Sequence, residues 1–192
     1  MVKIGFICEG DTEQILLLSD NFQSYLSSIN LRAVNVINAC GSGNLLPHNI
    51  KGYIQSLENA GAEVILILTD LDNEICITQT KERIMARQQD IVIIAVKKIE
   101  AWFLANEIAM RSLLNNSHFS FSLPELENNP FETINNLLVQ YTGRGIGKSS
   151  AGKIRLVKRL LDAGLDLSNS GIHPKCFSAK YFLDTLQKLA LK

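Results

Sequence analysis

The chain has 192 residues, 46% of them hydrophobic, and its 19 lysines and arginines balance 19 aspartates and glutamates. This length predicts one domain, or one domain with an appendage, and the hydrophobic content is sufficient for a buried core. A net charge of zero argues against a broad polycationic surface, although it is compatible with a local basic patch.

Cysteine usage and hydropathy indicate the compartment. The four cysteines lie far apart and form no CxxC pair, which favours free thiols in a reducing compartment over a disulfide framework or a zinc site. The longest apolar run is far shorter than the roughly 20 residues of a membrane helix, and the first segment lacks the pattern of a signal peptide. We therefore expect a cytoplasmic protein that does not cross a membrane.

The first 110 residues alternate between predicted strands and helices. In chain order we expect a strand over 2–8, a helix over 12–28, a strand over 31–38, a helix from Pro47 to about Ala60, a strand over 63–69, a helix over 78–88, a strand over 90–96 and a helix from about Glu100. Nearly continuous apolar strands separated by helices indicate a parallel sheet covered on both faces. The predicted fold class is α/β, a Rossmann-like parallel sheet of about four strands with flanking helices.

No strand pattern follows residue 110. Residues 115–130 are loop-like, and helices are expected over 131–141, 149–163 and 178–190. We therefore divide the chain into an α/β domain over 1–110 and a helical appendage over 111–192 that packs on it. The pattern leaves open whether the appendage contacts substrate or forms a homodimer.

Acidic residues follow three of the four predicted strands. Glu9 follows the first strand, Asp70 and Asp72 follow the third, and Glu100 follows the fourth. Glu13 lies four residues after Glu9, in the first turn of the next helix. Because the carboxyl ends of parallel strands meet at one edge of a sheet, we expect the five side chains to converge there. Asp70 and Asp72 project the same way if the extended conformation continues past the strand.

Converging carboxylates require a cation or shared protons, because like charges at close range disfavour joint ionisation. Oxygen ligands without histidine or cysteine suit Mg²⁺ or Mn²⁺, and two such ions can hold the attacking and leaving oxygens of a phosphodiester. Taken singly, each acid has an ordinary explanation, such as helix capping or compensation of the helix dipole. Their combination on neighbouring strands favours a metal site.

With these residues the sequence resembles the Toprim fold, the metal-binding domain of topoisomerases, primases and several nucleases. The matching residues are Glu9 after the first strand and the DxD pair Asp70 and Asp72 after the third. The string CEGDTE is similar to the EGxTE form of OLD-type nucleases and of small stand-alone bacterial and phage-defence relatives. In that branch Glu13 and Glu100, the latter in the string IEAW, complete the site. The resemblance covers residues 2 to about 107.

The resemblance implies a Mg²⁺- or Mn²⁺-dependent nuclease that acts on DNA or RNA. Asp70 and Asp72 would ligate Mg²⁺, and Glu9 would ligate metal or act as a general acid or base. Glu13 and Glu100 would hold a second metal ion. OLD proteins carry an ATPase domain ahead of the Toprim domain, whereas this chain begins at the first Toprim strand. We therefore expect any ATPase to be a separate partner.

Basic residues offer candidate contacts to a nucleic-acid backbone. Lys97 and Lys98 flank the acidic edge, where they either offset its charge or contact phosphate. The string GRGIGKSSAGK departs from the spacing of a phosphate-binding P-loop. It predicts a glycine-rich turn into a helix whose N-terminus, with Arg144, Lys148 and Lys153, grips a backbone phosphate, or else a loop with solvated cations.

Two alternatives to a nuclease remain. The first is a non-catalytic Toprim-like module of a phage-defence or toxin–antitoxin complex, in which metal serves structure only and an antitoxin is the partner. The neutral net charge favours it modestly. The second is a doubly wound domain that binds a phosphorylated small molecule.

Overall fold

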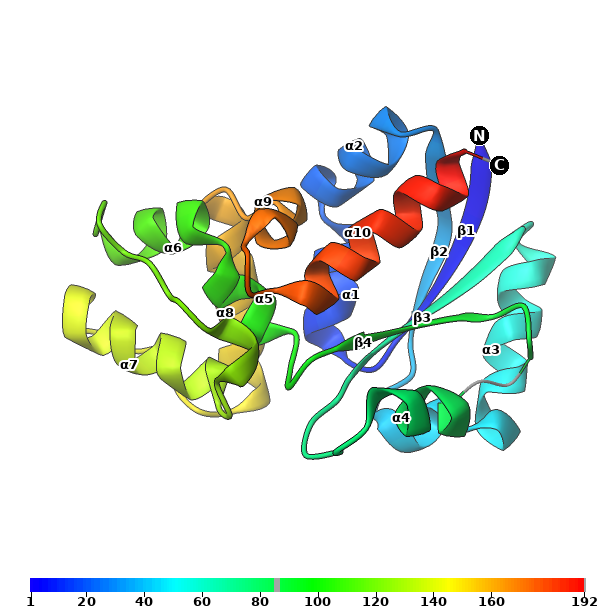
Figure 1. Ribbon diagram of the computed structural model, residues 1–192, viewed down its shortest axis with the longest axis horizontal. Coiled ribbons are helices and arrows are strands. Elements are labelled where there is room, and N and C mark those ends of the chain that lie inside the picture. The colour runs from blue at the N-terminus through cyan, green and yellow to red at the C-terminus, as the bar shows by residue number, and fades with distance from the viewer. Residues whose placement is uncertain (85–86, 192) are drawn as a thin grey trace.

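The computed structural model describes residues 1–84 and 87–191, and it contains a four-stranded sheet flanked by helices (Figure 1). Neighbouring strands are parallel throughout, in the order β2-β1-β3-β4. The predicted α/β class with a parallel sheet of four strands is therefore confirmed. The strands are β1 (Val2–Cys8), β2 (Leu31–Asn38), β3 (Val64–Asp70) and β4 (Ile91–Ala95).

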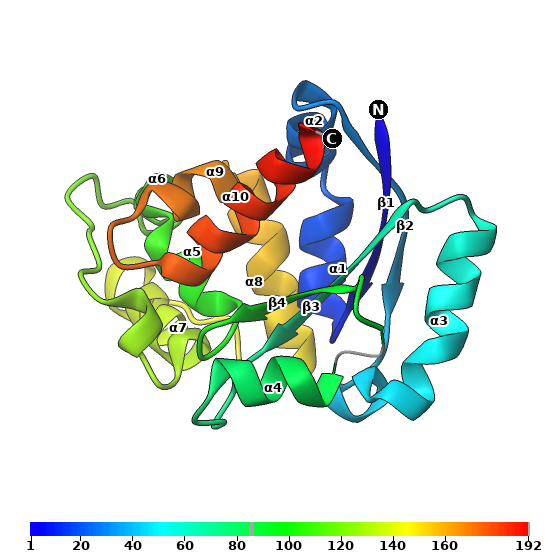
Figure 2. The ribbon, with the colours of Figure 1, turned by 45° about the vertical axis from the view of Figure 1, so that its right-hand side comes forward.

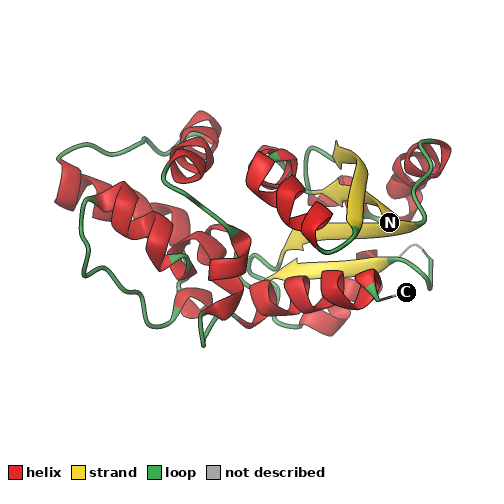
Figure 3. Ribbon diagram, turned by 90° about the horizontal axis from the view of Figure 1, so that it is seen from above, coloured by secondary structure: helices red, strands yellow, loops and turns green. Residues whose placement is uncertain are grey.

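Helices cover both faces of the sheet, as Figure 3 shows from above. The helices up to residue 105 are α1 (Asp11–Leu18), α2 (Asp20–Ser28), α3 (Pro47–Asn59), α4 (Ile77–Ile84) and α5 (Glu100–Ala105), with a 3₁₀ turn η1 (Ser42–Leu45). They are followed by α6 (Glu107–Leu114), η2 (Pro124–Leu126), α7 (Pro130–Thr142), α8 (Ser150–Asp162), α9 (Leu167–Ile172) and α10 (Phe177–Ala190).

Each strand sends alternate side chains to two separate cores, because successive residues of a strand face opposite sides. Phe6 and Leu66 pack with the side chains of α1, α2, α5 and α10 on one face. Ile7 and Ile67 pack with α3 and the end of α4 on the other. Burial on both faces explains why these strands are almost continuously apolar in sequence.

Two predicted helices are interrupted by polar residues that cap the following helix. The segment 12–28 breaks at Ser19, whose hydroxyl donates to the carbonyl of Leu16 at 2.7 Å and accepts from the amide of Phe22 at 3.4 Å. Beyond Glu100, α5 ends at Ala105, and the side chain of Asn106 accepts from the amide of Ala109 at 3.1 Å. These side chains compete with the helical hydrogen bonds of the backbone, so the helix restarts in a new direction.

The other helix predictions differ from the structure mainly at their ends. The predicted helix over 78–88 corresponds to α4, and its residues 85 and 86 lie outside the described part of the chain. The short helix α9 was not predicted, because its string LSNSGI has no helical hydrophobic pattern. Among the described residues, no helix is long and apolar enough to cross a membrane.

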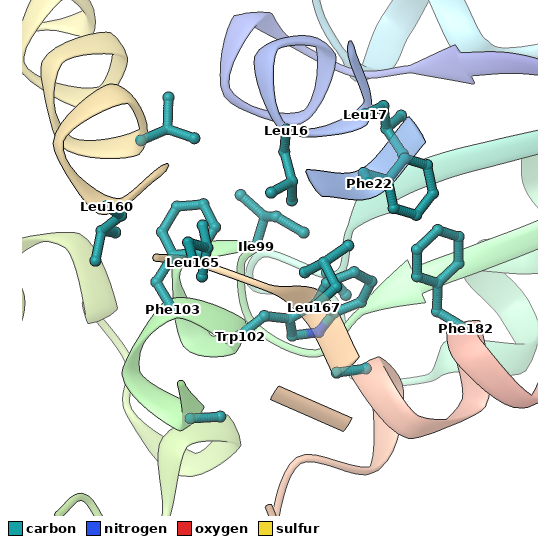
Figure 4. Close-up of a cluster of buried hydrophobic side chains, with 14 of the residues drawn as sticks. Leu16, Leu17, Phe22, Ile99, Trp102, Phe103, Leu160, Leu165, Leu167 and Phe182 are labelled. Atoms are coloured by element: carbon teal, nitrogen blue, oxygen red, sulfur yellow. The ribbon is translucent and has the colours of Figure 1, made fainter. Parts of the chain in front are cut away.

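The helices after residue 110 share the core of the sheet. Phe182 of α10 stacks on Phe22 and on Trp102, with ring centroids 5.8 and 5.5 Å apart. Figure 4 shows these rings together with Leu160 of α8 in one cluster of buried side chains. The domain boundary near residue 110 stays a prediction, but the hydrophobic core extends across it.

Helix α8 runs beside α1 (Figure 2). This packing brings the first turn of α8 to the end of the sheet at which β1 and β3 terminate, and Ser150 and Lys153 line a pocket there with Glu9 and Asp70. A segment distant in sequence therefore forms one wall of the region in which the acidic residues were predicted to meet.

Candidate functional site

The pocket at the carboxyl edge of the sheet has a volume of about 350 Å³. Four of the five predicted acidic residues line it, and Lys98 and Lys153 contribute cations. Ligands of open α/β sheets bind at this edge, since the strands end there and the loops that follow diverge. The acidic residues of the lining are Glu9, Glu13, Asp70 and Asp72, with Asp11 at the start of α1.

Glu9 is held by the neighbouring strand. Its amide continues the sheet by donating to the carbonyl of Leu68 at 3.1 Å. Its carboxylate Oε2 accepts from the hydroxyl of Thr69 at 2.5 Å and from the amide of Asp70 at 3.3 Å. These contacts fix the orientation of Glu9 beside the end of β3. Thr69 thus orients Glu9; it was not predicted as a site residue, although its place directly before the DxD pair was a usable signal.

Glu13 is buried in the first turn of α1, with 5% of its surface exposed. A Cβ atom at Gly10 would lie 3.2 Å from Glu13 Oε2, so the carboxylate lies close against the backbone between β1 and α1. Burial, together with the charges of Glu100 and Glu9, raises the pKa of Glu13 to about 7, although its own backbone hydrogen bond and the charge of Lys153 act in the opposite direction.

Asp70 ends β3, and its carboxylate accepts from the amide of Ile99 at 2.8 Å, just before α5. The pKa of Asp70 is raised well above its ordinary value, first by loss of hydration and then by the charges of Glu13, Glu100 and Glu9. Asp70 therefore interacts electrostatically with all three glutamates of the acidic cluster.

Asp72 does not continue the extended conformation of β3. Its φ is +51°, in the left-handed region, and its amide donates to the carbonyl of Lys97 at 2.7 Å. The condition under which Asp70 and Asp72 would project the same way therefore fails, because the chain turns after Leu71. The carboxylate of Asp72 instead pairs with Lys98, with 2.5 Å between Oδ1 and Nζ. The pKa of Lys98 is raised, because this contact and nearby acids outweigh its burial.

Glu100 is fully buried at the start of α5. Neither of its carboxylate oxygens has a hydrogen-bond partner of normal geometry among the described residues. The ammonium group of Lys153 nevertheless lies 3.0 Å from Oε1. This distance is short enough for an ion pair, but the geometry is not that of a well-directed hydrogen bond. A buried carboxylate with this little compensation is costly, so it is the most distinctive group of the site.

The segment after β2 closes the side of the pocket. The side chain of Asn38 donates to Asp11 at 2.7 Å and accepts from the amide of Cys40 at 2.8 Å. The amide of Gly41 donates to the carbonyl of Glu9 at 2.8 Å, with a φ of +123° that favours glycine. The turn after β2 is thus bound to the residue that follows β1. Asn38 was not predicted as a site residue, although its place at the end of a predicted strand was a usable signal.

The predicted basic contacts divide into two groups. Lys98 and Lys153 lie in the pocket, whereas neither the exposed Arg144 nor Lys148 is part of its lining. Lys148 pairs with Glu132 of α7 at 2.5 Å on the surface. Lys97 is not part of the lining either; its φ is +61°, and its carbonyl accepts from the amide of Asp72.

Over residues 1–84 and 87–191, no three His, Cys, Asp or Glu side chains stand in an arrangement ready to hold a metal ion. Hydrogen bonds to Glu9 and Asp70, together with the ammonium groups of Lys98 and Lys153, offset part of the charge of the acidic cluster. Comparison of the chain with protein-family models, with curated proteins and with solved structures finds no match.

Proposed function

We propose that the protein is a Mg²⁺- or Mn²⁺-dependent phosphodiester hydrolase that acts on nucleic acid. The observation that carries this proposal is Glu100, a buried carboxylate whose oxygens lack hydrogen bonds, next to a cluster in which the pKa values of Glu13 and Asp70 are raised. Such a group of acids stores unfavourable electrostatic energy, which a divalent cation would relieve. The resemblance to Toprim and OLD-type nucleases supports the same chemistry.

The donor set fits a hard cation, because it consists of carboxylate oxygens without histidine or sulfur ligands. Mg²⁺ or Mn²⁺ would be held by Asp70, Asp72, Glu9, Glu13 and Glu100, and would supply positive charge for a phosphodiester and its attacking water. Asp72 would have to exchange its present contact with Lys98 for that role.

The chain's own residues would orient the reactants. Glu9 is fixed by Thr69 and the amide of Asp70, so it can accept a proton from water at a defined position. Lys98 and Lys153 can contact phosphate oxygens at the pocket wall. The recessed acids favour a substrate whose backbone can enter the pocket between the 38–41 segment and α8.

Cleavage assays with Mg²⁺ and with Mn²⁺ on plasmid, single-stranded DNA and RNA test this function. Replacement of Asp70 by Asn keeps the size of the side chain but removes its charge, and we expect at least about a 100-fold loss of activity. Asp20→Asn, at an exposed position of α2, is the matched control and should cleave like the wild type. Equal cleavage by the Asp70→Asn variant would contradict the proposed role.

A non-catalytic module is the second candidate, and the two lysine–carboxylate pairs favour it. Lys98 and Lys153 already offset part of the acidic charge, so the folded protein can accommodate the acidic cluster without a catalytic role for it. In that case metal would raise the melting temperature without cleavage, and an antitoxin or a separate ATPase of a phage-defence complex would be the partner. A homodimer is a further arrangement to test by light scattering.

Activity on mononucleotides but not on polymers would instead favour a phosphorylated small molecule as the substrate, for which a pocket of about 350 Å³ is large enough.

The four free cysteines support placement of the protein in the reducing cytoplasm.

A further inference from the structure

Lys153 is the one cation of the described residues that lies within ion-pair distance of Glu100. It sits in the first turn of α8, which packs beside α1, and its ammonium group reaches the start of α5. About 38% of the Lys153 side chain is exposed, whereas 1% of the Glu100 side chain is. The carboxylate is therefore fixed inside the protein, and the ammonium group has an open side toward the pocket.

The two lysine–carboxylate pairs of the site differ in their hydrogen-bond geometry. Lys98 makes a hydrogen bond of 2.5 Å to Asp72, whereas Lys153 stands 3.0 Å from Glu100 without satisfying either oxygen. The contact of Lys153 is thus mainly a compensation of charge. Such a contact is readily exchanged for a stronger cation, because no directed hydrogen bond has to be broken.

We propose that Lys153 is the internal counter-cation of the metal-free site, which neutralises Glu100 and competes with a divalent cation for that carboxylate. This role rests on the metal site proposed above. An ammonium group and a divalent cation repel each other, so binding of the ion drives Lys153 away from Glu100. The side chain can leave while the helix stays in place, because its exposed side faces the pocket.

The packing of α8 supports a movement of the side chain rather than of the helix. A Cβ atom at Gly152 would lie 2.2 Å from the carbonyl oxygen of Gly147, so the first turn of α8 is pressed against the preceding loop. The backbone of Lys153 is anchored by this contact. Exchange of the counter-cation therefore requires rotation about side-chain bonds, which is fast and costs little.

Two opposite effects follow from competition. Loss of the ammonium group leaves Glu100 uncompensated and so lowers the stability of the metal-free protein. The same loss removes the competitor and so raises the affinity for metal. A residue that only supports the fold would produce the first effect without the second, and a residue that ligates or assists the ion would lower the affinity.

The test compares Lys153→Met, which keeps the length of the side chain, with Lys148→Met as the matched control on the exposed Glu132 pair. Melting temperature is measured in EDTA, and the affinities for Mg²⁺ and Mn²⁺ are measured by calorimetry. We expect Lys153→Met to melt lower in EDTA and to bind metal about three- to tenfold more tightly than wild type. Lys148→Met should match the wild type in both measurements.

The outcomes separate this inference from the proposed function. Metal binding of equal or lower affinity in Lys153→Met overturns the counter-cation role and leaves the metal site standing. Absence of metal binding in both proteins overturns the metal site and this role together. If Lys153→Met is unfolded in EDTA, refolding on addition of Mg²⁺ supports the role, and failure to refold overturns it.

Discussion

At the scale of single residues, the site is dominated by the balance between burial and charge. Glu13 and Glu100 are almost completely buried, yet they lie within electrostatic reach of one another and of Asp70. Desolvation and mutual repulsion both disfavour the ionised forms. The acidic cluster therefore makes the metal-free protein sensitive to pH, independently of any catalytic role.

Glu13 contributes to this pH dependence of stability. Its pKa is about 7 in the folded protein, against an ordinary value of 4.5. Between these values the folded state binds more protons than the unfolded state, so stability falls as pH rises. Below pH 4.5 the penalty is absent, and above pH 7 it is complete, at about 3 kcal/mol.

Urea unfolding in EDTA at pH 5 and pH 8 measures this penalty. We expect the wild type to lose stability between these values, and Glu13→Gln to lose distinctly less, because the neutral amide has no ionised form to desolvate. Glu82→Gln, at an exposed position of α4, should follow the wild type. Parallel pH profiles for wild type and Glu13→Gln would show that Glu13 ionises freely in the folded state.

At the scale of elements, glycines decide how closely helix ends approach their neighbours. Gly152 lies in the first turn of α8 against the carbonyl of Gly147, a contact that leaves no space for a side chain. Gly52 lies in the exposed middle of α3, where an added methyl group would meet no atom within 4 Å. The same residue type is thus required at one helix and dispensable at another.

Substitution of these two glycines by alanine should have opposite effects. Gly152→Ala forces α8 away from its loop, and we expect a loss of about 1–3 kcal/mol in the free energy of unfolding. Gly52→Ala should gain about 0.5–1 kcal/mol, because alanine favours the helix and meets no clash. Chemical denaturation measures both. A neutral Gly152→Ala variant would mean that the loop before α8 adapts without cost.

At the scale of the whole molecule, a buried polar network joins the C-terminal helix to the sheet. The hydroxyl of Ser178, at the start of α10, accepts from Trp102 Nε1 at 2.7 Å and from the amide of Val96 at 3.2 Å. It also donates to the carboxylate of Glu125 at 2.5 Å. These contacts connect α10 to η2, to α5 and to the residue after β4, all of which lie far before α10 in the sequence.

Removal of the hydroxyl should weaken the whole structure rather than one helix. Ser178→Ala leaves the buried indole N–H of Trp102 without its acceptor and takes one donor from Glu125, and we expect a loss of about 2–3 kcal/mol. Ser56→Ala, on the exposed side of α3, should change stability by less than about 0.5 kcal/mol. Equal unfolding midpoints for the two variants would show that the network contributes little.

The sequence by itself determined the α/β class, the four strands and the edge at which the acids gather. These features depend on local information: apolar runs of strand length, helical spacing and polar residues directly after strands. The rule that parallel strands end at one edge then places Glu9 and Asp70 together without knowledge of the packing. The boundaries of the strands agree with the structure within about a residue for the same reason.

The tertiary structure alone decided which groups compensate those acids. Lys153 pairs with Glu100, and the amide of Asp72 in its turn donates to the carbonyl of Lys97. Like the hydrogen bond between Trp102 and Ser178, these contacts join residues that lie far apart in the sequence. Such contacts leave no periodic trace in a sequence, because a side chain's burial and its distant partners are set by packing. The sequence therefore indicates where the acidic residues lie, whereas the tertiary structure determines how much free energy their burial costs and which cations neutralise them.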